Sequence, residues 1–257
     1  CVLKACGIVK AAEKGHEIHA KIIKDGLLTK DIVLGNALVD MYTKCGNLLK
    51  AQEVFDNLSS RNAISWNALI VAYAKSGHAK DALTCFEKMR LEGVHPDVIT
   101  FASAIKACAD THAIEKGSEI HLEISQAGLL GKDIILDSAL VDMYAKCGML
   151  EKAQMMFDKL KVRDVISWTA LIAGYVEQDR SEEALKSFEQ MKREHVSPDA
   201  VTFACCLKAC GKIGAVSKGE EIHVEIARKD IINKNVSIES CLINMYSKCG
   251  SLVKARE

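Results

Sequence analysis

Residues 37–46 read Ala-Leu-Val-Asp-Met-Tyr-Thr-Lys-Cys-Gly, and nine of these ten residues recur in residues 139–148, 102 positions further along the chain. Other short phrases keep the same spacing: Glu-Ile-His begins at residues 17, 119 and 221, Lys-Cys-Gly at 44, 146 and 248, Ile-Ser-Trp at 64 and 166, and Pro-Asp at 96 and 198. A fixed period is typical of repeat arrays, in which each unit buries its apolar face against its neighbours. We therefore expect an array of similar units.

Residues 63–97 contain two amphipathic stripes, each with apolar residues at i, i+3, i+4 and i+7. The stripes consist of Trp66, Leu69, Ile70 and Tyr73, and then of Ala82, Cys85, Phe86 and Met89. Gly77 separates them, and Gly93 and Pro96 follow the second stripe, which is the order of stop signals expected at helix C-termini. The segment is therefore predicted to be an αα-hairpin, and the fold class to be all-α.

The period divides into hairpins of 35, 36 and 31 residues, which we term regular, long and short units. In chain order the predicted units are a partial long unit (1–31), a short unit (32–62), a regular unit (63–97), a long unit (98–133), a short unit (134–164), a regular unit (165–199), a long unit (200–235) and a partial short unit (236–257). We expect residues 1–257 to form a single array. Because it begins and ends within units, without the polar caps of complete arrays, we expect it to be a fragment of a longer protein.

The composition limits the classes of partner that the chain is expected to have. The chain has 34 Lys and Arg against 34 Asp and Glu, so its formal net charge of zero gives no support for a nucleic-acid partner. A basic stripe on one face stays compatible with such a partner. No apolar run approaches the roughly 20 residues needed to span a bilayer, so no membrane partner is expected.

Six of the eleven cysteines are periodic: Cys6, Cys108 and Cys210, and Cys45, Cys147 and Cys249. Each lies in a helical apolar pattern, where a free thiol packs as a small hydrophobe, so we expect buried thiols rather than disulfides.

No catalytic constellation is found in the sequence. His-x-Glu, spelled at residues 121–123 and 223–225, is the first half of the zinc-deaminase signature. The equivalent place in the first copy reads His19-Ala20-Lys21, and no Cys-x-x-Cys occurs. We therefore expect no metal, no cofactor and no enzyme activity in this chain.

A 35-residue hairpin that ends in Pro-Asp and alternates with 36- and 31-residue variants resembles the pentatricopeptide repeat family, and more narrowly its PLS class of land plants. Two phrases are characteristic of it, Val-Asp-Met-Tyr-Ala-Lys-Cys-Gly at 141–148 and Ile-Ser-Trp-Thr-Ala-Leu-Ile-Ala-Gly-Tyr at 166–175. The resemblance implies a right-handed superhelical α-solenoid of helix-turn-helix repeats that binds single-stranded RNA, about one base per repeat. The nearest rival is the tetratricopeptide repeat, whose uniform period of about 34 residues this sequence lacks; that reading implies a protein-interaction scaffold.

The family selects each base through the fifth and last residues of a unit. The matching residues are Asn36 with Asn62, Asn67 with Asp97, Ser138 with Asp164, Thr169 with Asp199, and Ser240, whose partner would follow Glu257. They resemble the family's combinations for a pyrimidine, uracil, guanine, guanine and a purine; the alternative is that polar residues near a helix start are ordinary caps. Long units carry Ala102 and Ala204 at the fifth place and receive no base. In the family's parallel orientation, the six complete units imply 5′-pyrimidine-U-any-G-G-any-3′.

Two further sets of residues follow from the resemblance. The second residues of the units, which in the family sandwich the base, are Val33, Ile64, Ile99, Ile135, Ile166 and Val201. β-Branched residues that start a packed helix explain these almost as well. The thirteenth residues, where the family places a phosphate-contacting cation, include Lys44, Lys75, Lys146 and Lys248. Their alternative role is a favourable charge near a helix C-terminus, and Glu177 and Asp110 interrupt the series.

The resemblance thus implies the recognition part of an organellar RNA-processing factor, in mitochondrion or chloroplast, with C-to-U editing as its pathway. The expected partners are single-stranded RNA, an editing deaminase and accessory editing proteins. Chemistry would come from a deaminase-like domain further along the full-length protein, or from a recruited deaminase.

Overall fold

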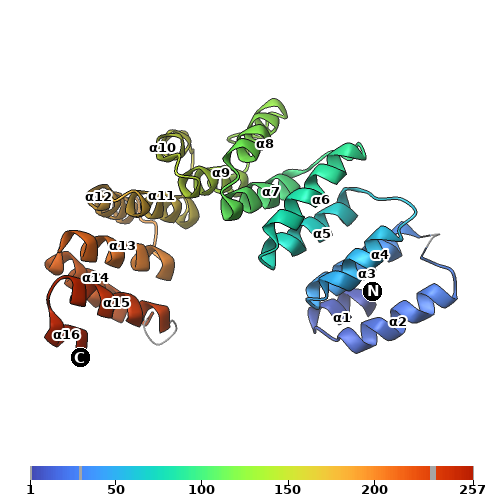
Figure 1. The fold of residues 1–257 in the computed structure, drawn as a ribbon, viewed down its shortest axis with the longest axis horizontal. Helices are drawn as coiled ribbons and strands as arrows, with labels where there is room; N and C mark the ends of the chain where they lie inside the picture. Colours follow the sequence, from blue (N-terminus) through green and yellow to red (C-terminus); the bar gives the residue numbers. More distant parts are fainter. Residues whose placement is uncertain (1, 29–30, 232–235, 257) are drawn as a thin grey trace. The chain divides into compact units, whose positions relative to one another are not determined.

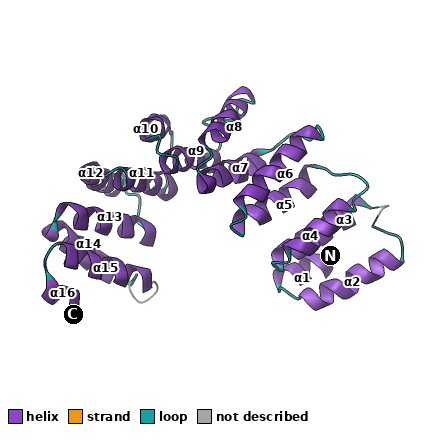
Figure 2. Ribbon diagram, viewed as in Figure 1, coloured by secondary structure: helices purple, strands orange, loops and turns teal. Residues whose placement is uncertain are grey.

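The computed structural model describes residues 2–28, 31–231 and 236–256. Within these ranges it contains α-helices and no β-strand (Figure 2). In chain order the helices are α1 (Val2–Ile8), α2 (Ala12–Lys24), α3 (Ile32–Lys44), α4 (Leu48–Asp56), α5 (Ala63–Lys75), α6 (Ala79–Leu91), α7 (Val98–Thr111), α8 (Ile114–Gln126), α9 (Ile134–Lys146), α10 (Leu150–Asp158), α11 (Val165–Glu177), α12 (Ser181–Arg193), α13 (Ala200–Ile213), α14 (Val216–Arg228), α15 (Val236–Lys248) and α16 (Leu252–Arg256). None of these helices is long and apolar enough to cross a membrane. The predicted all-α class is confirmed.

The helices fall into two compact units, Cys1–Leu129 and Leu130–Glu257 (Figure 1). In the first unit α1, α3, α5 and α7 pack against one another in order, and in the second α9, α11, α13 and α15 do the same. The even-numbered helices form a second layer, in which α2, α4 and α6, like α10, α12 and α14, each contact the odd-numbered helices before and after them. Each compact unit is therefore a stack of helical hairpins in two layers. The assignment of residues 1–257 to a single array stays a prediction.

The hairpins are held by the stripes that the sequence predicts. Trp66, Leu69 and Ile70 are almost fully buried in α5. The Trp66 ring meets Phe55 of α4 edge to face, with ring centroids 4.5 Å apart, and such aromatic pairs contribute beyond the area they bury. The contact returns one period later between Trp168 and Phe157, also at 4.5 Å. One packing solution therefore serves both copies.

The recurrent Lys-Cys-Gly triplet ends the first helix of each short unit. Gly46 and Gly148 have φ values of +79° and +77°, in the left-handed region that glycine enters without a Cβ penalty. This left-handed glycine turns the chain toward the second helix of the hairpin.

One detail of the cysteine prediction is wrong. Cys6, Cys108 and Cys210 are buried within helices, and burial raises the pKa of the Cys210 thiol to about 12. Cys45 and Cys147 instead lie at the C-cap, half-buried, and Cys249 follows the last residue of α15. The reason is the glycine that follows each of them. Because this glycine adopts the left-handed conformation, the last helical residue is the lysine that precedes the cysteine. The cysteines in the described ranges form no disulfide bond.

Candidate functional site

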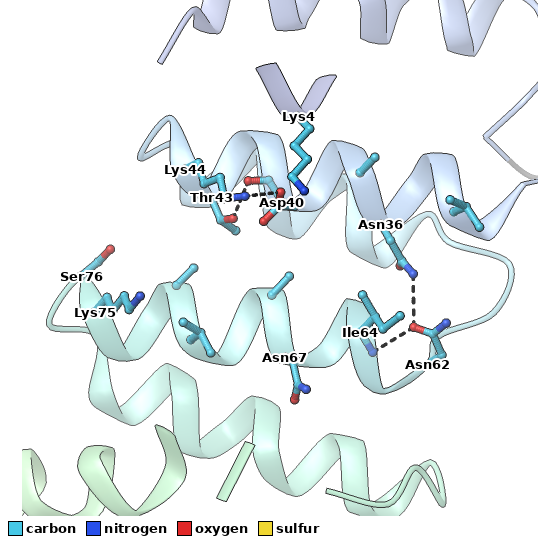
Figure 3. A pocket seen from close by; sticks show the side chains of 15 residues that line it. Lys4, Asn36, Asp40, Thr43, Lys44, Asn62, Ile64, Asn67, Lys75 and Ser76 are labelled. Carbon is cyan, nitrogen blue, oxygen red and sulfur yellow. Dashed lines mark hydrogen bonds and ion pairs between the residues drawn. The ribbon is translucent and has the colours of Figure 1, made fainter. Parts of the chain in front are cut away.

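In the first compact unit a groove of about 810 Å³ lies between α3 and α5, with Lys4 of α1 beside it (Figure 3). Its lining includes seven of the residues predicted from the sequence: Val33, Asn36, Lys44, Asn62, Ile64, Asn67 and Lys75. In the second compact unit a groove of about 250 Å³ between α13 and α15 is lined by Val201 and Lys248, among others. The layer of first helices thus brings residues far apart in sequence onto one surface within each compact unit.

Asn36 and Asn62 meet at the edge of the larger groove. The Asn36 Nδ2 donates to the Asn62 Oδ1 at 3.2 Å, and Figure 3 shows this bond between the two helices. The same Oδ1 accepts the backbone N–H groups of Ile64 and Ser65, each at 3.1 Å, and so caps α5. Asn62 is therefore both an ordinary helix cap and the partner of the fifth residue of its unit. The two roles that the sequence left open are compatible.

Asn67 and Asp97 repeat this arrangement. The Asn67 Nδ2 donates to the Asp97 Oδ2 at 2.7 Å, while the Asp97 Oδ1 accepts the Thr100 N–H at 2.9 Å and caps α7. Burial, the largest single effect, raises the pKa of Asp97, but the hydrogen bonds from Thr100 and Asn67 lower it. Together they outweigh burial, so the pKa of Asp97 lies below its ordinary value of 3.8.

The two pairs predicted for guanine differ in geometry. Ser138 donates directly to the Asp164 Oδ1 at 3.0 Å. Within the described ranges, which include both residues, no hydrogen bond joins Thr169 directly to Asp199. The Thr169 hydroxyl instead lies 2.7 Å from that of Thr202, which donates to the Asp199 Oδ1 at 2.8 Å. Structure therefore adds a bridging residue that the sequence reasoning missed.

A signal for the bridging residue exists in the sequence. Each regular and each complete long unit has a hydroxyl at its third place: Ser65, Thr100, Ser167 and Thr202. All four side chains are fully buried and form capping boxes with the preceding terminal residue. The two complete short units have leucine there, Leu34 and Leu136.

The six second residues all lie on the surface, although they are apolar. Their exposed fractions are 72% for Val33, 66% for Ile64, 59% for Ile99, 63% for Ile135, 54% for Ile166 and 57% for Val201. Core packing therefore does not explain them. Scattered exposed hydrophobics need no explanation, but recurrence at one place in six units marks a surface that is available for contact.

The four predicted phosphate-contacting lysines are the last residues of α3, α5, α9 and α15. Lys44 binds Asp40 at 2.6 Å and Lys146 binds Asp142 at 2.8 Å, one turn earlier in the same helix. Lys75 and Lys248 are exposed and form no ion pair with the described residues. All four positions also suit the helix dipole, so the phosphate role stays a prediction. Ser240 lies exposed on α15, and its base contact likewise stays a prediction.

Glu177 and the histidines of the second helices have partners within the fold. Glu177, which interrupts the lysine series, binds Lys208 of α13 at 2.7 Å. The His19 Nδ1 lies 2.9 Å from the Tyr42 hydroxyl, and the His223 Nδ1 lies 3.0 Å from that of Tyr246. These are repeated contacts between helices. Among the described residues no group of three His, Cys, Asp or Glu is arranged to hold a metal ion.

The sequence pattern of the PPR repeat family matches residues 61–110 and 163–212, and that of the PPR repeat matches residues 36–62 and 138–165, which together are more than half of the chain. This chain belongs to the pentatricopeptide repeat (PPR) family. One PPR-containing protein of Arabidopsis thaliana is 35% identical over 256 residues, covering 100% of this chain and 37% of that protein. A second, named as mitochondrial, is 37% identical over 256 residues, which are 100% of this chain and 25% of that protein. This PPR chain thus spans about a quarter to two fifths of the length of such relatives.

Solved structures share the fold. The PPR protein PPR10 in complex with an 18-nt psaJ RNA element matches 95% of this chain and 36% of its own, with a TM-score of 0.75 and 18% identity. A tetratricopeptide repeat protein from Parabacteroides merdae matches 95% of this chain and 97% of its own, with a TM-score of 0.65 and 13% identity. These likenesses establish the stacked-hairpin solenoid fold. Because both repeat families share this fold, the fold alone does not identify the ligand, and the residues of the groove carry the information about it.

Proposed function

We propose that this chain is a sequence-selective, single-stranded RNA-binding array of the PLS class. The alternation of 31-, 35- and 36-residue units supports that class. We further propose that it is the recognition part of an organellar C-to-U editing factor. In this proposal the chemistry belongs to a deaminase-like domain or to a recruited deaminase, with accessory editing proteins. The names of relatives that are mitochondrial or chloroplastic support an organelle.

One observation carries the RNA-binding proposal. Val33 and Ile64, the second residues of neighbouring units, line the same groove as the hydrogen-bonded pair Asn36 and Asn62. An unstacked base has two apolar faces and a polar edge, and single strands offer such bases freely. Two exposed branched side chains suit the faces, and amide groups that both donate and accept suit the edge. The groove thus offers the chemistry of one base between two units.

Selection from random single-stranded RNA at low salt tests this proposal. We expect the purified chain to enrich 5′-pyrimidine-U-any-G-G-any-3′. Thr169→Asn should then shift the second guanine toward uracil, because it recreates the Asn–Asp combination of Asn67 and Asp97. Thr84→Asn makes the same chemical change at an exposed place on the second-layer helix α6 and should leave the selected sequence unchanged. A folded chain that enriches no sequence would refute the proposal.

A tetratricopeptide-type scaffold is the second candidate. The zero net charge and the likeness to the Parabacteroides merdae protein favour it. It predicts no enrichment in the RNA selection, and it gives no reason for the recurrent hydrogen bonds between fifth and last residues.

A further inference from the structure

We infer that Thr202 is a specificity-determining residue for the unit 165–199, although it lies in the next unit and outside the pair that selects the base. The inference rests on the proposed RNA-binding function. It starts from the hydrogen bonds of one buried hydroxyl, which has a single proton and two lone pairs.

All three hydrogen-bonding sites of the Thr202 hydroxyl are accounted for. A carboxylate only accepts, so the proton of Thr202 goes to the Asp199 Oδ1 at 2.8 Å. One lone pair accepts the Asp199 backbone N–H at 3.3 Å. The remaining lone pair faces the Thr169 hydroxyl at 2.7 Å. Thr169 must therefore donate its only proton to Thr202.

This proton direction decides what the pair offers to a ligand. Thr169, with its proton engaged, presents only lone pairs, and the Asp199 carboxylate also only accepts. The Watson–Crick edge of guanine carries two adjacent donors, N1–H and N2–H₂, whereas adenine has an acceptor at N1. An acceptor-only site therefore favours guanine over adenine. Without the Thr202 hydroxyl, the Thr169 proton is free to turn to the adenine N1.

A bridge through the third residue also occurs one period earlier, but with the opposite proton direction: the fifth residue presents an acceptor, the Asn67 Oδ1, so the Thr100 hydroxyl donates to it. The Thr100 hydroxyl contacts the Asn67 Oδ1, accepts the Asp97 N–H at 3.2 Å and lies 2.9 Å from the Asp97 Oδ1. Since the Asn67 Nδ2 donates to Asp97, Thr100 sets the orientation of that amide. The third residue of a long unit thus orients the fifth residue of the regular unit before it.

The short unit 134–164 provides a built-in control. The Ser167 hydroxyl occupies the equivalent third place and is equally buried, but its hydrogen bonds go only to Asp164. Ser138 reaches Asp164 without a bridge. Ser167→Ala therefore removes a capping hydroxyl that bonds only to the backbone of Asp164, and leaves the side-chain hydrogen bond between Ser138 and Asp164 in place. Thr202→Val removes both a capping hydroxyl and the bridge, at nearly constant side-chain size.

The test compares dissociation constants of the whole chain for two pairs of RNAs with the selected core. One pair differs only by guanine or adenine at the nucleotide of the unit 165–199, and the other only by guanine or adenine at the nucleotide of the unit 134–164. We expect Thr202→Val to lower the guanine-over-adenine ratio about fivefold, the scale of one neutral hydrogen bond. The ratio at the neighbouring Ser138 nucleotide should not change. Thr202→Ser, which keeps the hydroxyl, should retain the wild-type ratio, and Ser167→Ala should leave both ratios unchanged.

Three results would overturn the inference. A folded Thr202→Val chain with the wild-type ratio would show that Thr202 does not act on selectivity while leaving RNA binding intact. Equal loss in Thr202→Val and Ser167→Ala would assign the effect to capping. If the wild-type chain binds none of these RNAs, the proposed function itself fails. Thermal melting identifies folded variants; should Thr202→Val unfold, Thr202→Ala takes its place in the same comparison.

Discussion

Replacing Ile166 by alanine tests whether its exposed side chain contributes to RNA binding or to the stability of the fold. Ile166 is 54% exposed, and fully burying an isoleucine side chain stabilises by about 1.5–3 kcal/mol. A base that covers the exposed half therefore gains about 1 kcal/mol, or about fivefold in Kd. By the same reasoning the packed half of the side chain contributes about 1 kcal/mol to folding, so Ile166→Ala should lower the free energy of unfolding by no more than about 1 kcal/mol.

Leu171 supplies the matched control in the same helix. It is 1% exposed, so Leu171→Ala should cost about 2–5 kcal/mol of stability. Urea unfolding and fluorescence anisotropy with labelled core RNA measure the two quantities for both variants. We expect Ile166→Ala to weaken RNA binding about fivefold with a loss of stability of no more than about 1 kcal/mol. Leu171→Ala should lose more stability but keep the wild-type Kd under conditions where it is folded. An unchanged Kd for a folded Ile166→Ala chain would refute the sandwich reasoning.

Four further outcomes are expected. Asp164→Ala removes the cap of α11 and should lower the free energy of unfolding by about 1 kcal/mol in urea melts. The lowered pKa of Asp97 means that its ionised form stabilises the fold above the ordinary value of 3.8, and that this contribution is lost as pH falls below it. The stability difference between wild type and Asp97→Asn should therefore shrink from pH 7 to pH 3, and a constant difference would contradict it. Gly148→Ala, at a φ of +77°, should destabilise by about 1 kcal/mol in thermal melts. Lys75→Ala should reduce the slope of log K against log salt by about 0.7, and Lys146→Ala, whose cation already binds Asp142, by less.

Much of the local structure was predictable from the sequence. The stripe that begins at Trp66 gave α5, and Gly77 marked its end, because helix periodicity and glycine stops are local properties of the chain. The pairing of Asn67 with Asp97 was available only through the family resemblance, since these residues are 30 positions apart. The C-cap places of Cys45 and Cys147 were missed because the apolar pattern was followed up to the glycine, whereas the residue directly before a left-handed glycine is already the C-cap.

The sequence by itself determined the repeat and the all-α class, since amphipathic spacing specifies each helix and repetition specifies the period of the hairpins. Tertiary structure alone decided which polar groups meet. Thr169 and Thr202 lie 33 residues apart and touch only because α11 and α13 pack side by side. It also decided that Ile166 is exposed while Leu171, five residues later, is buried. Hydrogen bonds and exposure depend on neighbouring helices, and a linear pattern does not contain those neighbours.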